Sequence, residues 1–448
     1  MELSGKKVLV VGLARSGMAA IKVLTKLGAE VTLSENRKKE EIKELPELDA
    51  MGVQVEGQTV DVADHPYDLC VKNPGVPYRN NPFIDKLNEN GVPIITEIEL
   101  AYQVAKPQHY LAVTGSNGKT TTSTLLYDIV HKAYPEKTHL CGNIGIPLCE
   151  IVMEENLLEE EGHYIVLEIS NFQLINIDLF RPDAAVILNL SPDHLDFMGT
   201  LEAYYKSKTE VYRNMKGDDV FVLNVDDDTL VEYTEKYPIH CKINRFSLTR
   251  TDVDTFVKDG NIWVNGEEVL PLSAIRVVGM HNRQNVMAAV AIAKSAGVSN
   301  EDITAAVASF HGVEHRIEFV REKDGVKYYN DSKGTNIDAT ITALKAFDHG
   351  VLLLVGGYEK GLPMDEVRKH LGCVKKVIGY GASGPRIVHD LVGEEGIVVK
   401  TLDEALAEAN KLAVSGDTVL LSPTTSSFDQ FSCFEERGDY FKKLVNAL

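Results

Sequence analysis

The stretch YLAVTGSNGKTTTSTLL runs from Tyr110 to Leu126 and predicts a strand, a glycine-containing loop and a helix in direct succession. The apolar residues Tyr110–Val113 form the strand. In the loop that follows, glycines let backbone N–H groups approach phosphate oxygens, and the helix N-terminus adds partial positive charge. Lys119 can reach the β- and γ-phosphates, and Thr120 can bind Mg²⁺. We therefore expect a triphosphate site made of Gly115, Ser116, Asn117, Gly118, Lys119, Thr120 and Thr121.

The spacing of this loop differs from that of a Walker A loop. A Walker A loop needs a glycine five residues before the Gly-Lys pair, where this chain has Val113, so the loop is the shorter G-x-x-G-K-T. An ordinary strand–turn–helix corner is the alternative interpretation. A lysine directly after the second glycine has no packing reason to be there, which favours the phosphate site.

Length and charge limit the classes of protein to consider. A chain of 448 residues suggests about three domains, and its formal charge of −20 argues against nucleic acid or an anionic membrane as a partner. No signal peptide or long apolar run is present, and the six cysteines are scattered without a C-x-x-C pair. We expect a cytoplasmic protein with free thiols.

The N-terminal stretch KKVLVVGLARSGMAAIKVLTKLGAEVTLSE, from Lys6 to Glu35, predicts a Rossmann-like βαβ unit. Its glycine pattern is G-x-x-x-x-G, because Ala14 replaces the middle glycine of the dinucleotide motif. A nucleotide or nucleotide-sugar site is therefore favoured over a dinucleotide site. Asn73-Pro74-Gly75 follows the apolar strand Leu69–Val71 and either lines the same crevice or forms a plain surface turn.

The alternation of strands and helices predicts an α/β protein of three domains, 1–98, 99–312 and 313–448. We expect a Rossmann-like N-terminal domain, a central P-loop ATPase-like domain and a C-terminal Rossmann-like domain with a parallel sheet. Asp259-Gly260 and Asn265-Gly266 indicate hairpins in a β-rich stretch. We expect a linker and hinge near Gly312–Arg316.

Metal-binding side chains follow two successive predicted strands of the central domain. Glu168 ends one strand, and Asp193-His194-Leu195-Asp196 follows the next. Oxygen ligands with one imidazole suit Mg²⁺ or Mn²⁺ better than zinc. Glu168 could instead pair with a lysine, and His194 could donate to backbone. Lys206 and Lys208 lie on a polar helix predicted over 203–215, where surface exposure is the ordinary interpretation.

Further polar residues lie where ligands are expected. Asn282 and Asn285 share one face of a helix start and could bind a purine or ribose, although Asn282 could simply cap the helix. His315-Arg316 stands at the domain junction. The ends of three strands in the last domain carry polar loops that suit a small anionic substrate, namely Asn330–Asn336, Gly356–Gly361 and Ser422–Asp429.

The motifs GSNGKTT, LEISNFQL, DHLD, HNRQN, NDSKGTN and LSPTTSSFDQF occur in this order along the chain. Over the whole length, in three domains, they resemble the Mur ligases, the ATP-dependent ligases of peptidoglycan precursor synthesis. NDSKGTN and SSFDQF are most similar to the branch that adds D-glutamate. The resemblance implies ATP, UDP-N-acetylmuramoyl-L-alanine and D-glutamate as substrates, two Mg²⁺ ions (with Mn²⁺ as an alternative) and a monomer.

The resemblance also implies roles for single residues. Lys119, His194 and Lys208 would be catalytic; Thr120, Glu168, His194 and Lys208, as a carbamate, would hold metal; and Asn282, Asn285, Arg316 and Asp331 would bind ATP. The UDP end would contact Arg15, Ser16, Gly17, Asn36, Arg37, Asn73 and Gly75, and Asn143 would touch the same substrate. The D-glutamate pocket would comprise Lys333, Thr335, Lys360, Ser427, Phe428 and Phe434. Glu35 and Arg15 depart from the family pattern.

Three other classes of protein were considered. A folylpolyglutamate synthetase-like ligase shares the loop chemistry, but its phosphate loop lies near the N-terminus, whereas about a hundred residues precede the loop here. A nucleotide-dependent switch without chemistry leaves the three polar loops of the last domain unexplained. A dehydrogenase is disfavoured by Ala14.

Overall fold

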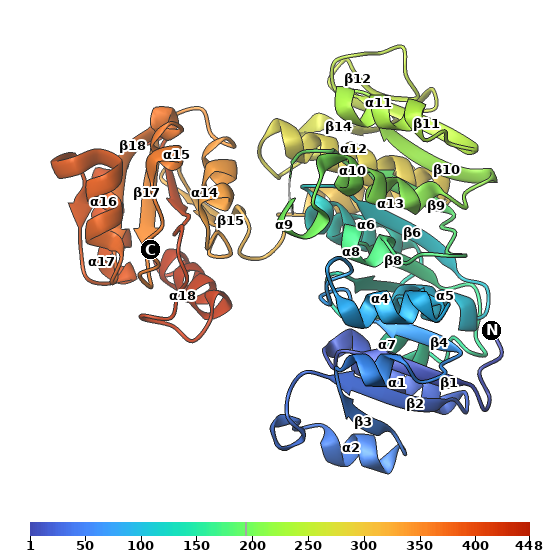
Figure 1. Cartoon of the computed structure of the whole chain (residues 1–448). Coiled ribbons are helices and arrows are strands. Elements are labelled where there is room, and N and C mark those ends of the chain that lie inside the picture. Colours follow the sequence, from blue (N-terminus) through green and yellow to red (C-terminus); the bar gives the residue numbers. More distant parts are fainter. Residues whose placement is uncertain (193–194) are drawn as a thin grey trace. The chain divides into compact units, whose positions relative to one another are not determined.

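The computed structural model describes residues 1–192 and 195–448 and contains three sheets with helices packed on them (Figure 1). Contacts divide the chain into two compact units. The first unit comprises Met1–Leu272 and Gln284–Val307, and the second comprises Ser273–Arg283 and Ala308–Leu448. The first unit holds two of the sheets, and the second unit holds the third.

The N-terminal sheet has five parallel strands in the order β3-β2-β1-β4-β5. Because side chains alternate along a strand, Val8 and Val10 of β1 face one core, and Leu9 and Val11 face another. Helices α1 and α5 cover the first face, and α3 and α4 cover the second. The elements are β1 (Lys7–Val11), α1 (Arg15–Lys26), β2 (Glu30–Glu35), α2 (Leu45–Ala50), β3 (Gln54–Gly57), α3 (Val60–Ala63), β4 (Leu69–Lys72), α4 (Pro82–Glu89), β5 (Ile94–Ile95) and α5 (Glu97–Val104).

The central sheet has nine strands in the order β14-β13-β12-β11-β10-β9-β6-β8-β7, parallel from β7 to β12 and antiparallel beyond. Its elements are β6 (His109–Thr114), α6 (Lys119–Ala133), β7 (Thr138–Gly142), α7 (Leu148–Glu154), β8 (Tyr164–Glu168), α8 (Asn171–Leu174), β9 (Ala184–Ile187), α9 (Leu195–Met198), α10 (Leu201–Thr209), β10 (Gly217–Asn224), α11 (Asp228–Lys236), β11 (Cys241–Ser247), β12 (Thr255–Lys258), β13 (Asn261–Val264), β14 (Glu267–Pro271), α12 (Met280–Ser295) and α13 (Asn300–Ser309).

One continuous apolar core joins the first two sheets. Side chains of α1, α5 and α7 pack together in it, so both sheets fall within one compact unit. Buried Glu97 of α5 strengthens this connection, because its carboxylate accepts the Cys149 amide of α7 at 2.6 Å. Burial raises the pKa of Glu97 to about 7. The domain boundaries at residues 98 and 312 stay a prediction.

The sheet of the second unit has six strands in the order β15-β16-β20-β17-β18-β19, of which only β15 runs antiparallel to its neighbour. Helices α17 and α18 cover one face, and α14, α15 and α16 cover the other. The elements are β15 (Glu318–Lys323), β16 (Val326–Asn330), α14 (Ile337–Leu344), β17 (Val351–Gly356), α15 (Asp365–Arg368), β18 (Val374–Tyr380), α16 (Gly384–Val392), β19 (Ile397–Val398), α17 (Leu402–Leu412), β20 (Thr418–Leu421) and α18 (Phe434–Asn446).

The expected α/β fold is confirmed, with two local differences. The last sheet is parallel as expected except for its edge strand β15, which runs antiparallel to β16. Asp259-Gly260 and Asn265-Gly266 have positive φ at both positions and connect β12 to β13 and β13 to β14, as the hairpin prediction required. The helix predicted over 203–215 is wrong in its extent, because α10 ends at Thr209 and a 3₁₀ turn, Glu210–Tyr212, follows. Among the described residues, no helix combines the length and apolar character needed to cross a bilayer.

Candidate active site

The phosphate loop connects β6 to α6 at the carboxyl edge of the central sheet. Gly115 has a φ of 148° and Gly118 a φ of 85°, values that favour glycine. The loop is held from the neighbouring β9 end, where Asn189 Oδ1 accepts the Asn117 amide at 2.9 Å and Ser191 O accepts from Ser116 Oγ at 2.9 Å. Loop conformation and strand position therefore support a preformed anion site.

Two lysines converge on this loop. Lys119 Nζ and Lys208 Nζ each donate to the Gly115 carbonyl at 2.9 Å, and Lys119 also donates to Ser116 O. Lys208 is 1% exposed and lies 4.7 Å from the Tyr204 ring centroid, whereas Lys206 is exposed. The surface interpretation therefore holds for Lys206 and is wrong for Lys208. The sequence signal that separates the two lysines is their spacing, because residues two apart on a helix point to different faces.

Glu168 ends β8, close to the start of α6. Its carboxylate is 2% exposed and accepts from Asn143 Nδ2 at 2.8 Å and from Ser123 Oγ at 3.3 Å. Ser123 Oγ also lies 3.2 Å from Thr120 O, to which it can donate.

The donor set fits a hard divalent cation. A buried carboxylate that accepts from two neutral donors, beside a threonine hydroxyl at a phosphate loop, suits Mg²⁺. A protonated Lys208 would repel that ion, and its carbamylation stays a prediction. His194, the other expected ligand, lies outside the described residues, as does Asp193.

The two asparagines of α12 are both buried. A side chain at Gly118 would collide with Asn285 Oδ1, so Asn285 packs directly on the phosphate loop. Asn282 Nδ2 donates to Val278 O at 2.7 Å. Asn282 is the third residue of α12, which begins at Met280, so it does not occupy the position that precedes the helix and caps it.

In the second unit, Asp331 follows β16 and is fully enclosed. Its carboxylate accepts the Ile317 amide at 3.2 Å and Ser422 Oγ at 2.7 Å. Burial raises the pKa of Asp331 to about 7, although these bonds and the charge of nearby Arg316 act in the opposite direction. His315 and Ile317 have φ values of 63° and 44°, so the chain is strained on both sides of Arg316.

Three loops of this unit meet at the carboxyl edge of its sheet. Lys360 Nζ donates to Thr335 O at 3.3 Å, and Lys333 Nζ lies 5.8 Å from the Phe434 ring centroid. Ser427 Oγ is buried, and no described residue bonds to it, so it is open to a ligand. Phe428 is 66% exposed, unlike the buried Ser427 beside it in the expected D-glutamate pocket.

Arg437 fastens these loops and was missed by the sequence analysis. Its guanidinium is 0% exposed, and it donates to Ser332 Oγ at 2.9 Å, to Ser332 O at 2.8 Å and to Thr425 O at 3.2 Å. An arginine inside the amphipathic helix α18 gives no sequence signal of such burial.

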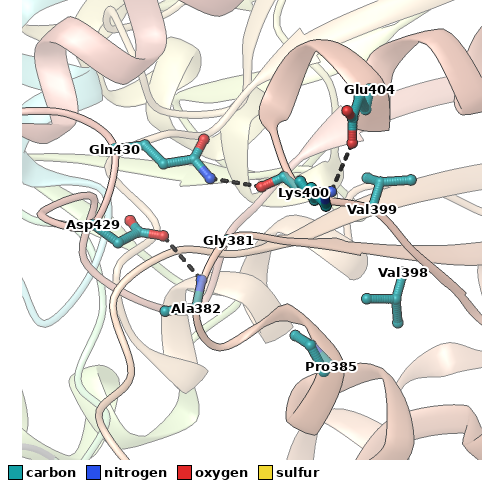
Figure 2. A pocket seen from close by; sticks show the side chains of 9 residues that line it. All are labelled: Gly381, Ala382, Pro385, Val398, Val399, Lys400, Glu404, Asp429 and Gln430. Atoms are coloured by element: carbon teal, nitrogen blue, oxygen red, sulfur yellow. Dashed lines mark hydrogen bonds between the residues drawn. The ribbon is translucent and has the colours of Figure 1, made fainter.

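A groove of about 680 Å³ lies beside this edge, between the ends of β18 and β19 (Figure 2). Asp429 Oδ2 accepts the Ala382 amide at 3.1 Å, and Gln430 Nε2 donates to Lys400 O at 2.8 Å. None of the residues expected in the D-glutamate pocket lines this groove, although Asp429, the last residue of the polar loop Ser422–Asp429, does. The groove is therefore adjacent to the expected amino-acid pocket and distinct from it.

The N-terminal crevice lies where β1 and β4 adjoin, the switch point of the parallel sheet. Glu35 accepts the Leu13 amide at 2.8 Å and pairs with Arg37 at 3.2 Å, so this departure from the family pattern organises the loop. Asn73 Oδ1 accepts the Gly75 amide at 3.0 Å, and its Nδ2 is buried without a hydrogen-bond partner in the described chain. Of the remaining expected contacts of this crevice, Ser16 and Gly17 lie in the first turn of α1, and Asn36 directly follows β2.

Two residues connect or support this crevice in ways that the sequence did not reveal. Arg15 donates to Gly145 O at 2.9 Å and lies 3.6 Å from Glu150, so it reaches the central part of the first unit. Lys72 at the end of β4 is 2% exposed and donates to Asn73 O and Val76 O at 3.2 and 3.0 Å. Burial lowers the pKa of Lys72 to about 8.

A phosphate loop at one sheet edge, two lysines on it and three α/β sheets define a nucleotide-dependent enzyme. Residues 113–293 match the Mur ligase middle domain, and residues 315–425 match the Mur ligase glutamate ligase domain. The UDP-N-acetylmuramoylalanine–D-glutamate ligase of Geobacillus sp. strain WCH70 is 41% identical over 450 residues, covering 99% of this chain and 98% of the relative. The enzyme of the same name from Bacillus subtilis strain 168 is 39% identical, covering 98% and 97%. The chain belongs to the Mur ligase family.

Solved structures agree with this fold. A UDP-N-acetylmuramoyl-L-alanyl-D-glutamate–2,6-diaminopimelate ligase aligns with a TM-score of 0.57 and 18% identity, covering 100% of this chain and 93% of that one. MurF from Acinetobacter baumannii aligns with a TM-score of 0.56 and 19% identity, covering 100% and 91%. At these identities the similarity supports the fold alone.

Proposed function

We propose that this chain is an ATP-dependent ligase that joins D-glutamate to UDP-N-acetylmuramoyl-L-alanine in the synthesis of peptidoglycan precursors. The observation that carries the proposal is the convergence of Lys119 and Lys208 on the Gly115 carbonyl, beside a buried Glu168. A protein of charge −20 needs such a local cation cluster to hold a triphosphate. The matched relatives of full length carry the same activity in their names.

The reaction proceeds in two steps. A carboxylate oxygen of the L-alanyl group attacks the γ-phosphorus of ATP, and ADP leaves, which gives an acyl phosphate. The neutral amine of D-glutamate then attacks the acyl carbon. The tetrahedral intermediate loses inorganic phosphate and a proton, and an amide bond remains.

The phosphate-loop residues act on the first step. The backbone N–H groups of Gly115–Thr120 and the Lys119 ammonium bind the phosphates and oppose the charge that develops on the phosphoryl oxygens. Thr120 and Glu168, with His194 and the Lys208 carbamate, would hold the two Mg²⁺ ions. When bound, these ions supply charge neutralisation and orientation of the phosphates. The carbamate forms when the neutral Lys208 amine adds CO₂ and releases one proton.

Each substrate has its own loops. Asn282, Asn285, Arg316 and Asp331 would contact ATP, and Asn143 would contact the acceptor near its reacting carboxylate. The UDP end would lie in the N-terminal crevice, against Arg15, Asn36, Arg37, Asn73 and Gly75. D-Glutamate would bind Lys333, Thr335, Lys360, Ser427 and Phe434, where two ammonium groups can meet its two carboxylates. A cytoplasmic monomer and a hinge near Gly312–Arg316 stay predictions.

An amino-acid panel in a phosphate-release assay tests the function. With ATP, Mg²⁺ and UDP-N-acetylmuramoyl-L-alanine, we expect release with D-glutamate and only background release with L-glutamate, L-lysine or diaminopimelate. Leaving out the UDP substrate should abolish release even with D-glutamate. Equal turnover with L-lysine or diaminopimelate would contradict the assignment.

Lys72→Met tests the proposed UDP site. Methionine keeps the length of the side chain but removes the bonds to Asn73 O and Val76 O, each about 1.5–3 kcal/mol for a charged donor. Part of the free energy of these two bonds positions the loop from Asn73 to Val76. We therefore expect KM for the UDP substrate to rise about tenfold, with kcat little changed. Thermal unfolding should be measured alongside, because losing both bonds costs stability even though removing a buried charge offsets part of that cost. Lys22→Met, at an exposed position of α1, is the matched control. An unchanged KM in Lys72→Met would reject the role.

A further inference from the structure

Two histidines and a glutamate form a cluster at the amino edge of the central sheet. His139 is the second residue of β7, His163 immediately precedes β8, and Glu155 follows α7. His139 Nε2 lies 2.9 Å from His163 Nδ1, and His139 Nδ1 lies 3.9 Å from Glu155 Oε1. One potential ligand atom from each residue falls within 4.8 Å of the others.

This cluster is separate from the phosphate-loop chemistry. β7 and β8 are parallel and in register, with His139 opposite Ile165 and Gly142 opposite Glu168. Three residues of strand separate Ile165 from Glu168, which corresponds to about 10 Å. The triphosphate and Mg²⁺ side chains thus lie at the other edge of the sheet, and the proposed reaction makes no use of the cluster.

From this geometry we propose that His139, His163 and Glu155 form a binding site for a zinc-like transition-metal ion. Two imidazoles and one carboxylate are a favourable donor set for Zn²⁺, with metal–ligand distances near 2.0–2.2 Å. Tetrahedral ligands at such distances are separated by about 3.3–3.5 Å. The ring nitrogens His139 Nε2 and His163 Nδ1 lie 2.9 Å apart, and one ligand atom from each of the three residues falls within 4.8 Å of the others, so a small movement of the side chains would admit the ion. Water would complete the coordination.

The surroundings prepare these imidazoles for metal. His163 is 7% exposed, and its backbone is fixed because its amide donates to Gln108 Oε1 at 2.8 Å and its carbonyl accepts from the His109 amide. Burial lowers the pKa of His139 and of His163, so protons compete less with a metal ion for their ring nitrogens. Zinc would replace the hydrogen bond between the two rings, and the ring that donates this bond would move its proton to its other nitrogen.

The bound ion would connect three chain segments, two of which lead into active-site residues. It would join the start of β7, the end of α7 and the start of β8, and the far ends of these two strands carry Asn143 and Glu168. His131 in the last turn of α6 lies close enough that its charge affects His139, and its Nδ1 is buried without a partner among the described residues. The ion would therefore stabilise the first unit rather than take part in catalysis.

Zinc binding to the whole protein tests the site. Chelator-treated protein would be titrated with Zn²⁺ in excess Mg²⁺, so that the oxygen-rich site is occupied. We expect one zinc site per chain and, at a zinc concentration of 100 times Kd, a rise of the thermal midpoint by about 3 °C or more. The double variant His139→Gln/His163→Gln should weaken zinc binding at least about 100-fold. Even the loss of a residue that only hydrogen-bonds to a metal ligand lowers metal affinity 10–100-fold. His109→Gln, which changes an exposed histidine outside the cluster, should bind as the unchanged protein does.

A second measurement does not depend on the variants folding. Co²⁺ added to the unchanged protein should give the intense visible bands of a tetrahedral site, and Zn²⁺ should displace it. Absence of zinc binding and of these bands would overturn the proposal, as would equal zinc affinity in the folded double variant. Loss of D-glutamate ligation would leave the metal titration unaffected, so the two proposals fail separately.

Discussion

Lys119→Ala is expected to lower turnover by about 10³-fold or more, or about 4 kcal/mol of transition-state stabilisation. The reason is electrostatic. Lys119 stands at the first position of α6, and its ammonium already lies 2.9 Å from the Gly115 and Ser116 carbonyls of the loop. Without Lys119, the negative charge on the transferred phosphoryl group would lack this neighbouring cation. The strongly negative net charge of the protein would not compensate for the loss.

The measurement is phosphate release at saturating substrates, together with thermal unfolding of the same preparation. Lys132→Ala is the matched control, since Lys132 lies near the end of the same helix and is exposed. Its turnover should equal that of the unchanged protein. A folded Lys119→Ala protein with more than a tenth of the normal turnover would contradict the phosphate-loop argument.

Lys208→Ala is expected to lower turnover by about 10²–10³-fold, and a small carboxylate should restore part of it. Lys208 is buried at the loop, where a carbamate would place anionic oxygens near the phosphates and metal. Acetate or formate can occupy the volume left by the truncated side chain and supply the missing oxygens. Bicarbonate should act in the same way.

Lys206→Ala controls for this variant, because Lys206 lies two residues away on α10 and is exposed. Thermal unfolding of both variants separates lost chemistry from lost packing. A ¹³C resonance of a carbamate in protein equilibrated with ¹³CO₂ should be present in the unchanged protein and absent in Lys208→Ala. Full activity of folded Lys208→Ala would remove the role.

Much of the fold could be predicted because local patterns agree with the final packing. The strands Lys7–Val11 and Ala184–Ile187 are nearly continuous apolar runs, as expected for parallel strands buried on both faces. Asp259-Gly260 fixes a hairpin through its backbone alone. The phosphate loop combines glycines, a lysine and a helix start within six residues, so its chemistry is also local.

The features that were missed depend on contacts between distant parts of the chain. β7 is the edge strand of the central sheet and contains the polar residue His139, which pairs with His163. Its sequence therefore lacks a clear apolar run. Lys72 and Arg437 carry charges into the interior, and only the carbonyl groups around them reveal why they fit. The single compact unit formed by the first two sheets arises from packing among α1, α5 and α7, which no local pattern encodes.

The most direct test of the account is the fate of oxygen in the L-alanyl carboxylate. UDP-N-acetylmuramoyl-L-alanine labelled with ¹⁸O at both carboxylate oxygens would be turned over with ATP and D-glutamate, and the inorganic phosphate analysed by mass spectrometry. Activation as an acyl phosphate predicts that every phosphate released carries one ¹⁸O and that the new amide retains the other. Unlabelled phosphate accompanied by amide product would contradict the proposed phosphorylation of the carboxylate.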